Sequence, residues 1–258
     1  MTRISDRLAR LRARGRKAFV GFVTAGDPSL DRTVEIAQAM DEAGVDVLEL
    51  GVPFSDPLAD GPVIQRSSER ALRQGTRLGD VLDVVRRIRS RCDLPLLLFS
   101  YFNPLLRHGL DALARDATAA GVDGVLVTDL PPEEADGWLA TARGAGLDTV
   151  FMAAPTSPEP RLRRVAAASR GFVYAVSRTG VTGERDVISE DAAPLVRRLK
   201  ALTGEPIVLG FGLSRPEQVR TAAEVADGVV VGSALVRFLE EHPQGDVAGH
   251  VRWLKSAM

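Results

Sequence analysis

Short apolar runs alternate with longer helical segments along the whole sequence of 258 residues. Within most of these runs apolar residues follow one another without polar alternation, which is typical of parallel strands covered on both faces. We assign eight such strands, at residues 18–23, 45–50, 94–99, 122–128, 147–152, 171–176, 206–209 and 228–231. Because eight units of strand and helix close into a barrel, the sequence predicts an α/β protein that folds as a single-domain (β/α)8 TIM barrel over residues 1–258.

Two further helices extend the predicted barrel. Residues 2–14 carry Ile4, Leu8 and Leu11 at helical spacing, which predicts an amphipathic helix packed before the first strand. A short helix is expected to begin at Ser233, directly after the eighth strand. An open doubly wound sheet is the alternative architecture, but its usual Gly-x-Gly-x-x-Gly motif is missing after the first strand.

The helices on either side of the fourth strand are expected from turn and proline signals. A helix near 109–120 ends at Gly121. Because proline favours the first turn of a helix, Pro131 and Pro132 are expected to open the helix that follows the fourth strand.

The composition argues against several classes of protein. A formal net charge of -1 indicates no polyanionic partner, so nucleic-acid binding is not expected. No apolar run approaches the ~20 residues that a membrane span requires, and the first turns are charged. The lone Cys92 excludes an internal disulfide and fits a reducing compartment. We therefore expect a cytoplasmic protein that does not bind membranes.

The stretch from Leu48 to Gly61 carries the first candidate site. Glu49 lies between two leucines at the carboxyl end of a strand, where an unpaired carboxylate costs several kcal/mol, and Asp60 lies in the loop that follows. Two carboxylates in different surroundings can have their pKa values pushed apart, so that one handles protons while the other stays charged. Helix caps or solvated loop charges are the simpler alternative.

A metal is a competing use for these carboxylates. The three histidines, His108, His242 and His250, are scattered along the sequence, and none lies near the acidic stretch. Because transition-metal sites in proteins draw heavily on imidazole ligands, no metal centre is expected.

Glycines at the ends of the last three strands form a second candidate site. They let backbone N–H groups approach an anion closely, and a helix that starts at Ser233 directs its positive end to the same place. Barrels frequently hold a phosphate between the loops after strands seven and eight, so a phosphate site is expected here. Turn formation alone is the alternative. The residues are Gly180, Gly183, Gly210, Gly212, Gly232 and Ser233.

Large apolar side chains near the carboxyl ends of several strands form a third candidate site. Any one of them needs no function, because barrel cores contain such residues. Together they would line a pocket for a flat apolar group joined to a phosphate. The residues are Phe22, Phe99, Tyr101, Leu126, Met152, Tyr174 and Phe211.

These motifs resemble the tryptophan synthase α-subunit family. The resemblance covers essentially the whole chain and is strongest in Leu48-Glu49-Leu50-Gly51 and in the segment Phe54-Ser55-Asp56-Pro57-Leu58-Ala59-Asp60-Gly61. It extends to Thr24-Ala25-Gly26-Asp27-Pro28, Tyr101 with Asn103-Pro104, Tyr174 with Val176-Ser177, Gly180-Val181-Thr182-Gly183, and Gly210-Phe211-Gly212-Leu213-Ser214.

The resemblance implies retro-aldol cleavage of indole-3-glycerol phosphate to indole and glyceraldehyde 3-phosphate. Glu49 would be the general acid/base, and Asp60 would bind the indole N–H. Thr182 would close onto Asp60 from its loop, while Thr128 stands where relatives carry Ala or another non-polar residue. Substrate would contact Phe22, Phe99, Tyr101, Leu126, Thr128, Met152, Tyr174 and Phe211, and phosphate would contact Gly183, Gly212, Gly232 and Ser233.

The resemblance also implies a partner. Family members dock on a β subunit in an α2β2 complex, with loop residues near Pro53 and Asp56 contributing. Pyridoxal phosphate is expected only in that β subunit, and no cofactor is expected in this chain.

Three other functions stay open at the level of sequence. One is an indole-releasing lyase that needs no β subunit, and another is a non-catalytic activator that has kept only the docking surface. The third is a different phosphate-binding barrel, such as an isomerase or epimerase, because glycine turns are generic. The stretch from Glu49 to Asp60 favours the lyase over the last two.

Overall fold

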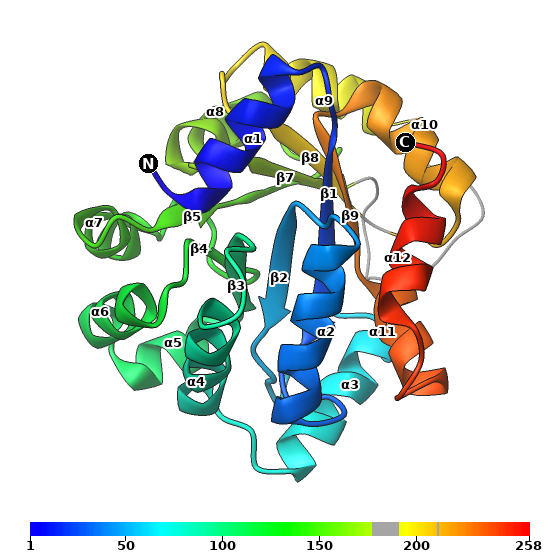
Figure 1. Cartoon of the computed structure of the whole chain (residues 1–258). Helices are drawn as coiled ribbons and strands as arrows, with labels where there is room; N and C mark the ends of the chain where they lie inside the picture. The colour runs from blue at the N-terminus through cyan, green and yellow to red at the C-terminus, as the bar shows by residue number, and fades with distance from the viewer. Residues whose placement is uncertain (177–190, 211) are drawn as a thin grey trace.

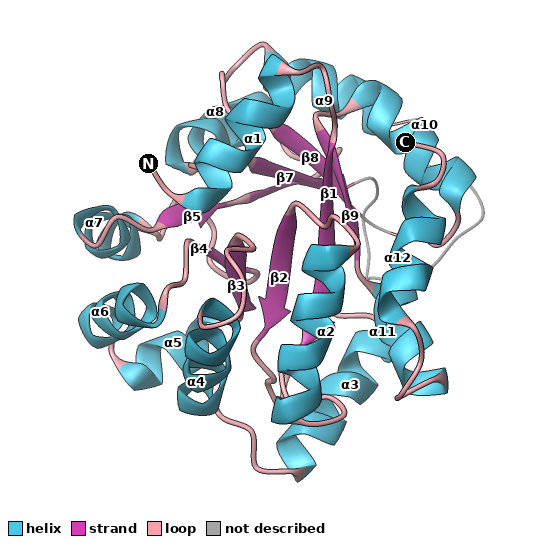
Figure 2. Cartoon of the chain, in the orientation of Figure 1, coloured by secondary structure: helices cyan, strands magenta, loops and turns pink. Residues whose placement is uncertain are grey.

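The computed structural model describes residues 1–176, 191–210 and 212–258. In this part of the chain, parallel strands form a sheet with the order β5-β4-β3-β2-β1-β9-β8-β7-β6. Helices surround the strands, and the sheet curls into a nearly closed barrel, which confirms the predicted fold (Figures 1 and 2). The strands are β1(Ala18–Thr24), β2(Val47–Gly51), β3(Leu96–Ser100), β4(Gly124–Val127), β5(Asp148–Val150), β6(Met152–Ala153), β7(Val173–Val176), β8(Ile207–Gly210) and β9(Gly228–Val231).

The predicted fifth strand is divided in the structure. Residues of β5 pair with β4, whereas residues of β6 pair with β7, and Phe151 lies between the two. The Phe151 carbonyl still accepts a hydrogen bond from the Tyr174 N–H at 3.1 Å, so this one segment of chain pairs with both neighbouring strands.

Helices follow the strands largely as predicted. Both additional helices are confirmed: α1 precedes the barrel, and α11 begins at Ser233. The helices are α1(Arg3–Ala13), α2(Leu30–Glu42), α3(Pro62–Arg73), α4(Leu78–Arg89), α5(Phe102–His108), α6(Leu110–Ala120), α7(Asp136–Gly144), α8(Glu159–Ala168), α9(Ala192–Lys200), α10(Pro216–Val225), α11(Ser233–Glu241) and α12(Val247–Lys255).

One helix start predicted from the sequence was wrong, and one helix was not predicted. The helix after β4 begins at Asp136 and not at the prolines, because Pro132 keeps the residue before it out of the helical region. The predicted helix near 109–120 is confirmed as α6, but the separate helix α5 that precedes it was not predicted. Pro104 is the third residue of α5, where a missing N–H costs nothing, since the first turn of a helix has no internal acceptor for it.

The apolar core has two parts. The larger part fills the space between the strands and the surrounding helices. The smaller part fills the barrel and includes Ile4, Leu8 and Leu11, so α1 packs its apolar face into the barrel interior as its spacing predicts. The strand residues of this inner part alternate along each strand, which sets the direction of every side chain at the carboxyl ends.

Candidate active site

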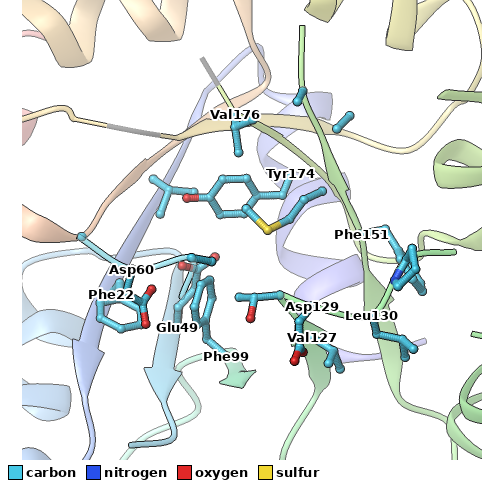
Figure 3. A pocket seen from close by; sticks show the side chains of 18 of the residues that line it. Phe22, Glu49, Asp60, Phe99, Val127, Asp129, Leu130, Phe151, Tyr174 and Val176 are labelled. Atoms are coloured by element: carbon cyan, nitrogen blue, oxygen red, sulfur yellow. The ribbon is translucent and has the colours of Figure 1, made fainter. Parts of the chain in front are cut away.

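Glu49 points into the barrel because of its place in β2. Val47, two residues earlier, belongs to the inner core, so strand alternation directs Glu49 to the same side. Its register partners Phe22 on β1 and Leu97 on β3 also belong to the inner core. Figure 3 shows the Glu49 side chain near Phe22, Phe99 and Asp60, below the Tyr174 ring.

The Glu49 carboxyl group is buried without a compensating charge. Its residue is 1% exposed, and its Oε1 has no hydrogen-bond partner among the described residues. Burial disfavours the charged form and raises the pKa of Glu49 from 4.5 to about 8. At neutral pH this carboxyl group therefore holds a proton that it can donate.

Asp60 lies at the entry to α3, where the backbone holds it in place. Gln65 on α3 donates from Nε2 to the Asp60 carbonyl oxygen at 2.8 Å, and the Asp60 N–H donates to the Pro57 carbonyl at 3.0 Å. Burial raises the pKa of Asp60 from 3.8 to about 6, and a hydrogen bond from the Tyr101 hydroxyl opposes that rise. Asp60 is therefore mostly ionised at neutral pH.

The two carboxyl groups thus differ in charge at the same pH. Oδ1 of Asp60, like Oε1 of Glu49, lacks a hydrogen-bond partner in the part of the chain that the structure describes. Burial is the main cause that raises the pKa of the Tyr174 hydroxyl, and the negative charges of Glu49 and Asp60 raise it further. The hydroxyl therefore faces the two carboxyl groups as a neutral group. An acid and a carboxylate, each with an oxygen available, face one space.

That space is a cavity of about 660 Å³ at the carboxyl ends of the strands. It brings together most of the candidate residues that come from widely separated parts of the sequence. Those that line it are Phe22, Glu49, Asp60, Phe99, Thr128, Met152, Tyr174, Gly212, Gly232 and Ser233. Thr182, Gly183 and Phe211, together with Gly180, lie outside the described residues.

Tyr101 and Leu126 lie around the cavity and not in its lining. The Tyr101 hydroxyl accepts a hydrogen bond from the Ala59 N–H at 2.9 Å and so supports the loop that carries Asp60. Leu126 is fully buried in the inner core, in register with Phe99. The Thr128 hydroxyl donates a hydrogen bond to the Ser100 carbonyl oxygen at 3.2 Å, at the end of the neighbouring strand. This hydroxyl therefore already has a hydrogen-bond partner.

Close aromatic packing depends on two strand glycines that the sequence did not single out for this role. A Cβ at Gly51 would lie 2.6 Å from the Phe22 ring, and one at Gly210 would lie 2.3 Å from the Tyr174 hydroxyl. Phe22 then meets Phe99 edge to face, with ring centroids 5.2 Å apart. Any larger residue at either glycine would push an aromatic ring into the cavity.

One end of the cavity suits an anion. Gly232 precedes α11 and has no side chain with which to cap it, so the first N–H groups of α11 are served by the backbone or by a ligand. Ser233 is the first residue of this helix and also lines the cavity. Gly212 has a φ of +78°, a conformation that favours glycine, and completes this end.

The cavity also extends to residues that no sequence motif singled out. Val127, Leu130 and Phe151 line it near the point where the fifth strand is divided (Figure 3). Arg161 also lines it. No glycine or proline lies at the point where the fifth strand is divided, so no residue type in the sequence indicates this division.

Residues 1–176, 191–210 and 212–258 contain no group of three or more His, Cys, Asp or Glu that could hold a metal ion. No helix among them has the length and apolar character to cross a membrane.

Comparison with known proteins agrees with this geometry. The family described as tryptophan synthase alpha chain matches residues 8–257. The tryptophan synthase alpha chain of Solibacter usitatus is 52% identical over 95% of this chain and 91% of its own length. That of Geobacter sulfurreducens is 50% identical over 100% of this chain and 98% of its own.

Solved structures give the same result. A chain of Mycobacterium tuberculosis tryptophan synthase superimposes with a TM-score of 0.93 at 41% identity, covering 99% of this chain and 98% of its own. Tryptophan synthase subunit alpha from Legionella pneumophila gives 0.90 at 35% identity, covering 100% and 97%. Since the family match and relatives about half identical to it span nearly its full length, the chain belongs to the tryptophan synthase alpha chain family.

Proposed function

We propose that the chain catalyses the α reaction of tryptophan synthase, which cleaves indole-3-glycerol phosphate to indole and glyceraldehyde 3-phosphate in the last step of L-tryptophan biosynthesis. One observation carries the assignment of roles. A protonated buried carboxyl group and an ionised one face the same cavity, which also has an anion site at one end.

Glu49 supplies the proton that the ring carbon needs. The proton moves from the Glu49 carboxyl group to the indole carbon that bears the glycerol phosphate chain. This removes the aromaticity of the five-membered ring and places a positive charge on its nitrogen. A pKa of about 8 suits this task, because the group is protonated at neutral pH but still acidic enough to transfer its proton.

Asp60 stabilises the positive charge that follows. Its carboxylate accepts a hydrogen bond from the ring N–H, which strengthens as the nitrogen becomes cationic. The carbon–carbon bond then breaks, its electron pair returns to the ring, and the hydroxyl of the chain becomes the aldehyde of glyceraldehyde 3-phosphate. The Glu49 carboxylate takes up the hydroxyl proton, so that both carboxyl groups recover their starting charge.

The remaining candidate residues hold the substrate. The phosphate group would bind to Gly212, Gly232 and Ser233 at the amino end of α11. Thr182, Gly183 and Phe211 join this proposed site through their sequence motifs. Closing the substrate between these groups would exclude water and strengthen each electrostatic contact.

A β subunit is the partner that membership of this family implies, and we propose an α2β2 complex in the cytoplasm. Asp56 and Leu58 support docking through the loop after β2, because both are exposed and Leu58 is 86% exposed although apolar. We place pyridoxal phosphate in the β subunit alone, since the proposed α reaction uses only acid–base and electrostatic groups.

Release of indole from indole-3-glycerol phosphate tests the proposal. The purified chain is expected to release indole slowly and to do so faster when the β subunit is added. An equal rate with and without the β subunit would indicate a stand-alone lyase. No release under either condition would contradict the proposal and favour an activator without catalytic function.

A further inference from the structure

A group of four charged side chains joins the two helices that begin at the cavity. It comprises Asp27, in the loop after β1, Arg66 and Arg70 on α3, and Glu240 near the end of α11. Two negative and two positive charges balance one another. We call these four residues the brace.

Arg70 is the centre of the brace. Its Nε and Nη2 donate to the two carboxylate oxygens of Asp27, each at 2.8 Å, and its Nη1 donates to Oε1 of Glu240 at 2.7 Å. All three guanidinium nitrogens are therefore in use. This planar, two-sided arrangement suits arginine and not lysine, whose ammonium group is a point charge.

Burial distinguishes the brace from ordinary surface ion pairs. Asp27 is 6% exposed, and the side chains of Arg70 and Glu240 are 31% and 25% exposed. Arg66 adds a second pair of hydrogen bonds to Glu240, at 2.8 and 2.7 Å. The hydrogen bonds from Arg66, and then the one from Arg70, lower the pKa of Glu240 to about 2. Glu240 therefore stays ionised through the working range of pH.

The brace lies far from the cavity ends of both helices. Asp60 immediately precedes Gly61, the cap of α3, and Ser233 opens α11. At 1.5 Å per residue, Arg70 lies about 12 Å along α3 and Glu240 about 10 Å along α11 from their first residues. The two helices pack against each other and both contact β1 (Figure 1). Arg66 and Arg70 on α3 therefore both hold Glu240 on α11, and with it the orientation of one helix against the other.

We propose that Arg70 is a positioning residue that fixes Asp60 relative to the amino end of α11, and so sets the distance between the ring nitrogen site and the phosphate site. The inference rests on the proposed function. It gives the brace a role in catalysis as well as in stability. Asp60, which would bind the ring nitrogen, lies at the start of α3, and the residues that would bind the phosphate lie at the start of α11; the brace joins these two helices.

Arg70→Gln is expected to separate catalysis from anion binding. With α11 intact, the dissociation constant for inorganic phosphate should stay within about twofold of the wild-type value. Because a misplacement of about 1 Å can cost 100-fold in rate, kcat for indole-3-glycerol phosphate should fall by about 10-fold to 100-fold. The measurement uses the chain in complex with its β subunit, at a temperature where circular dichroism shows each variant fully folded.

Arg73→Gln is the matched control. Arg73 lies on the same helix and forms an ion pair only with Glu69, also on α3, among the described residues, so its loss leaves the two helices joined. Arg70→Lys keeps the charge but not the two-sided geometry and should show an intermediate kcat. If Arg70→Gln does not fold, Glu240→Gln provides the same comparison from the other helix and should lower kcat without weakening phosphate binding.

A double variant shows whether Arg70 acts through α11. If it does, Arg70→Gln combined with Glu240→Gln should lower kcat by about the same factor as Glu240→Gln alone, since Glu240→Gln already removes the link from Arg70 to α11. An unchanged kcat in Arg70→Gln, or losses that multiply in the double variant, would overturn the role of Arg70. A wild-type complex that releases no indole would overturn the proposed function itself.

Discussion

Glu49→Gln is expected to lower the rate of indole release by at least about 100-fold, the size of a lost general acid/base contribution. The amide has nearly the same shape as the carboxyl group but has no acidic proton to give to the ring carbon. Because the residues proposed to bind phosphate, Gly212, Gly232 and Ser233, do not include Glu49, the affinity for inorganic phosphate should remain close to wild type. The comparison uses steady-state indole release and calorimetric titration of phosphate.

Glu205→Gln controls for the chemical change itself. Burial also raises the pKa of Glu205, but this residue lies just before β8, at the end of the barrel opposite the cavity. Its amide variant should retain wild-type turnover. Turnover in Glu49→Gln comparable to that of this control would reject the acid role of Glu49.

The same Glu49→Gln substitution is expected to stabilise the fold. The folded state holds a proton on Glu49 up to a pH of about 8, whereas the unfolded chain releases it near 4.5. Folding therefore requires uptake of a proton between these values, and the stability of the wild type falls as pH rises through this window. At 1.36 kcal/mol per pH unit, the cost reaches about 3 kcal/mol at pH 7.

Glutamine does not ionise, so the Glu49→Gln variant does not have this pH-dependent cost. Urea unfolding of both proteins at several pH values measures the difference in their free energies of unfolding. The free energy of unfolding of Glu49→Gln should exceed that of the wild type by about 3 kcal/mol at pH 7, with a smaller difference near pH 5. The exposed Glu69→Gln variant should show no such trend. A difference that is absent at pH 7, or that shrinks as pH rises, would show that Glu49 is not a buried acid.

The arrangement of the barrel could be predicted because its signals are local. Each strand is a short apolar run, and each run lies within a few residues of a strand in the structure. The division of the fifth strand at Phe151 could not be predicted, since it results from pairing with two different neighbours. The first residue of α7 depends on how Pro132 restricts the residue before it, which the composition of the turn does not reveal.

The two carboxyl groups proposed to act in catalysis could be selected from the sequence, for a physical reason. An acid between two leucines at a strand end is costly, and the structure shows that Glu49 is buried there. The space around the rings was not visible, because it depends on Gly51 lying beneath Phe22 from another strand. The brace could not be predicted from the sequence either, since Asp27 and Glu240 are more than two hundred residues apart and are linked through Arg70.

The pH dependence of kcat/KM for indole release by the isolated chain tests the central claim most directly. An ionised Asp60 and a protonated Glu49 are both required, so the rate should rise through a pH of about 6 and fall through about 8. The expected result is a bell-shaped profile with its maximum near neutral pH. A rate that continues to rise beyond pH 8 would contradict the account, because Glu49 would then act without its proton.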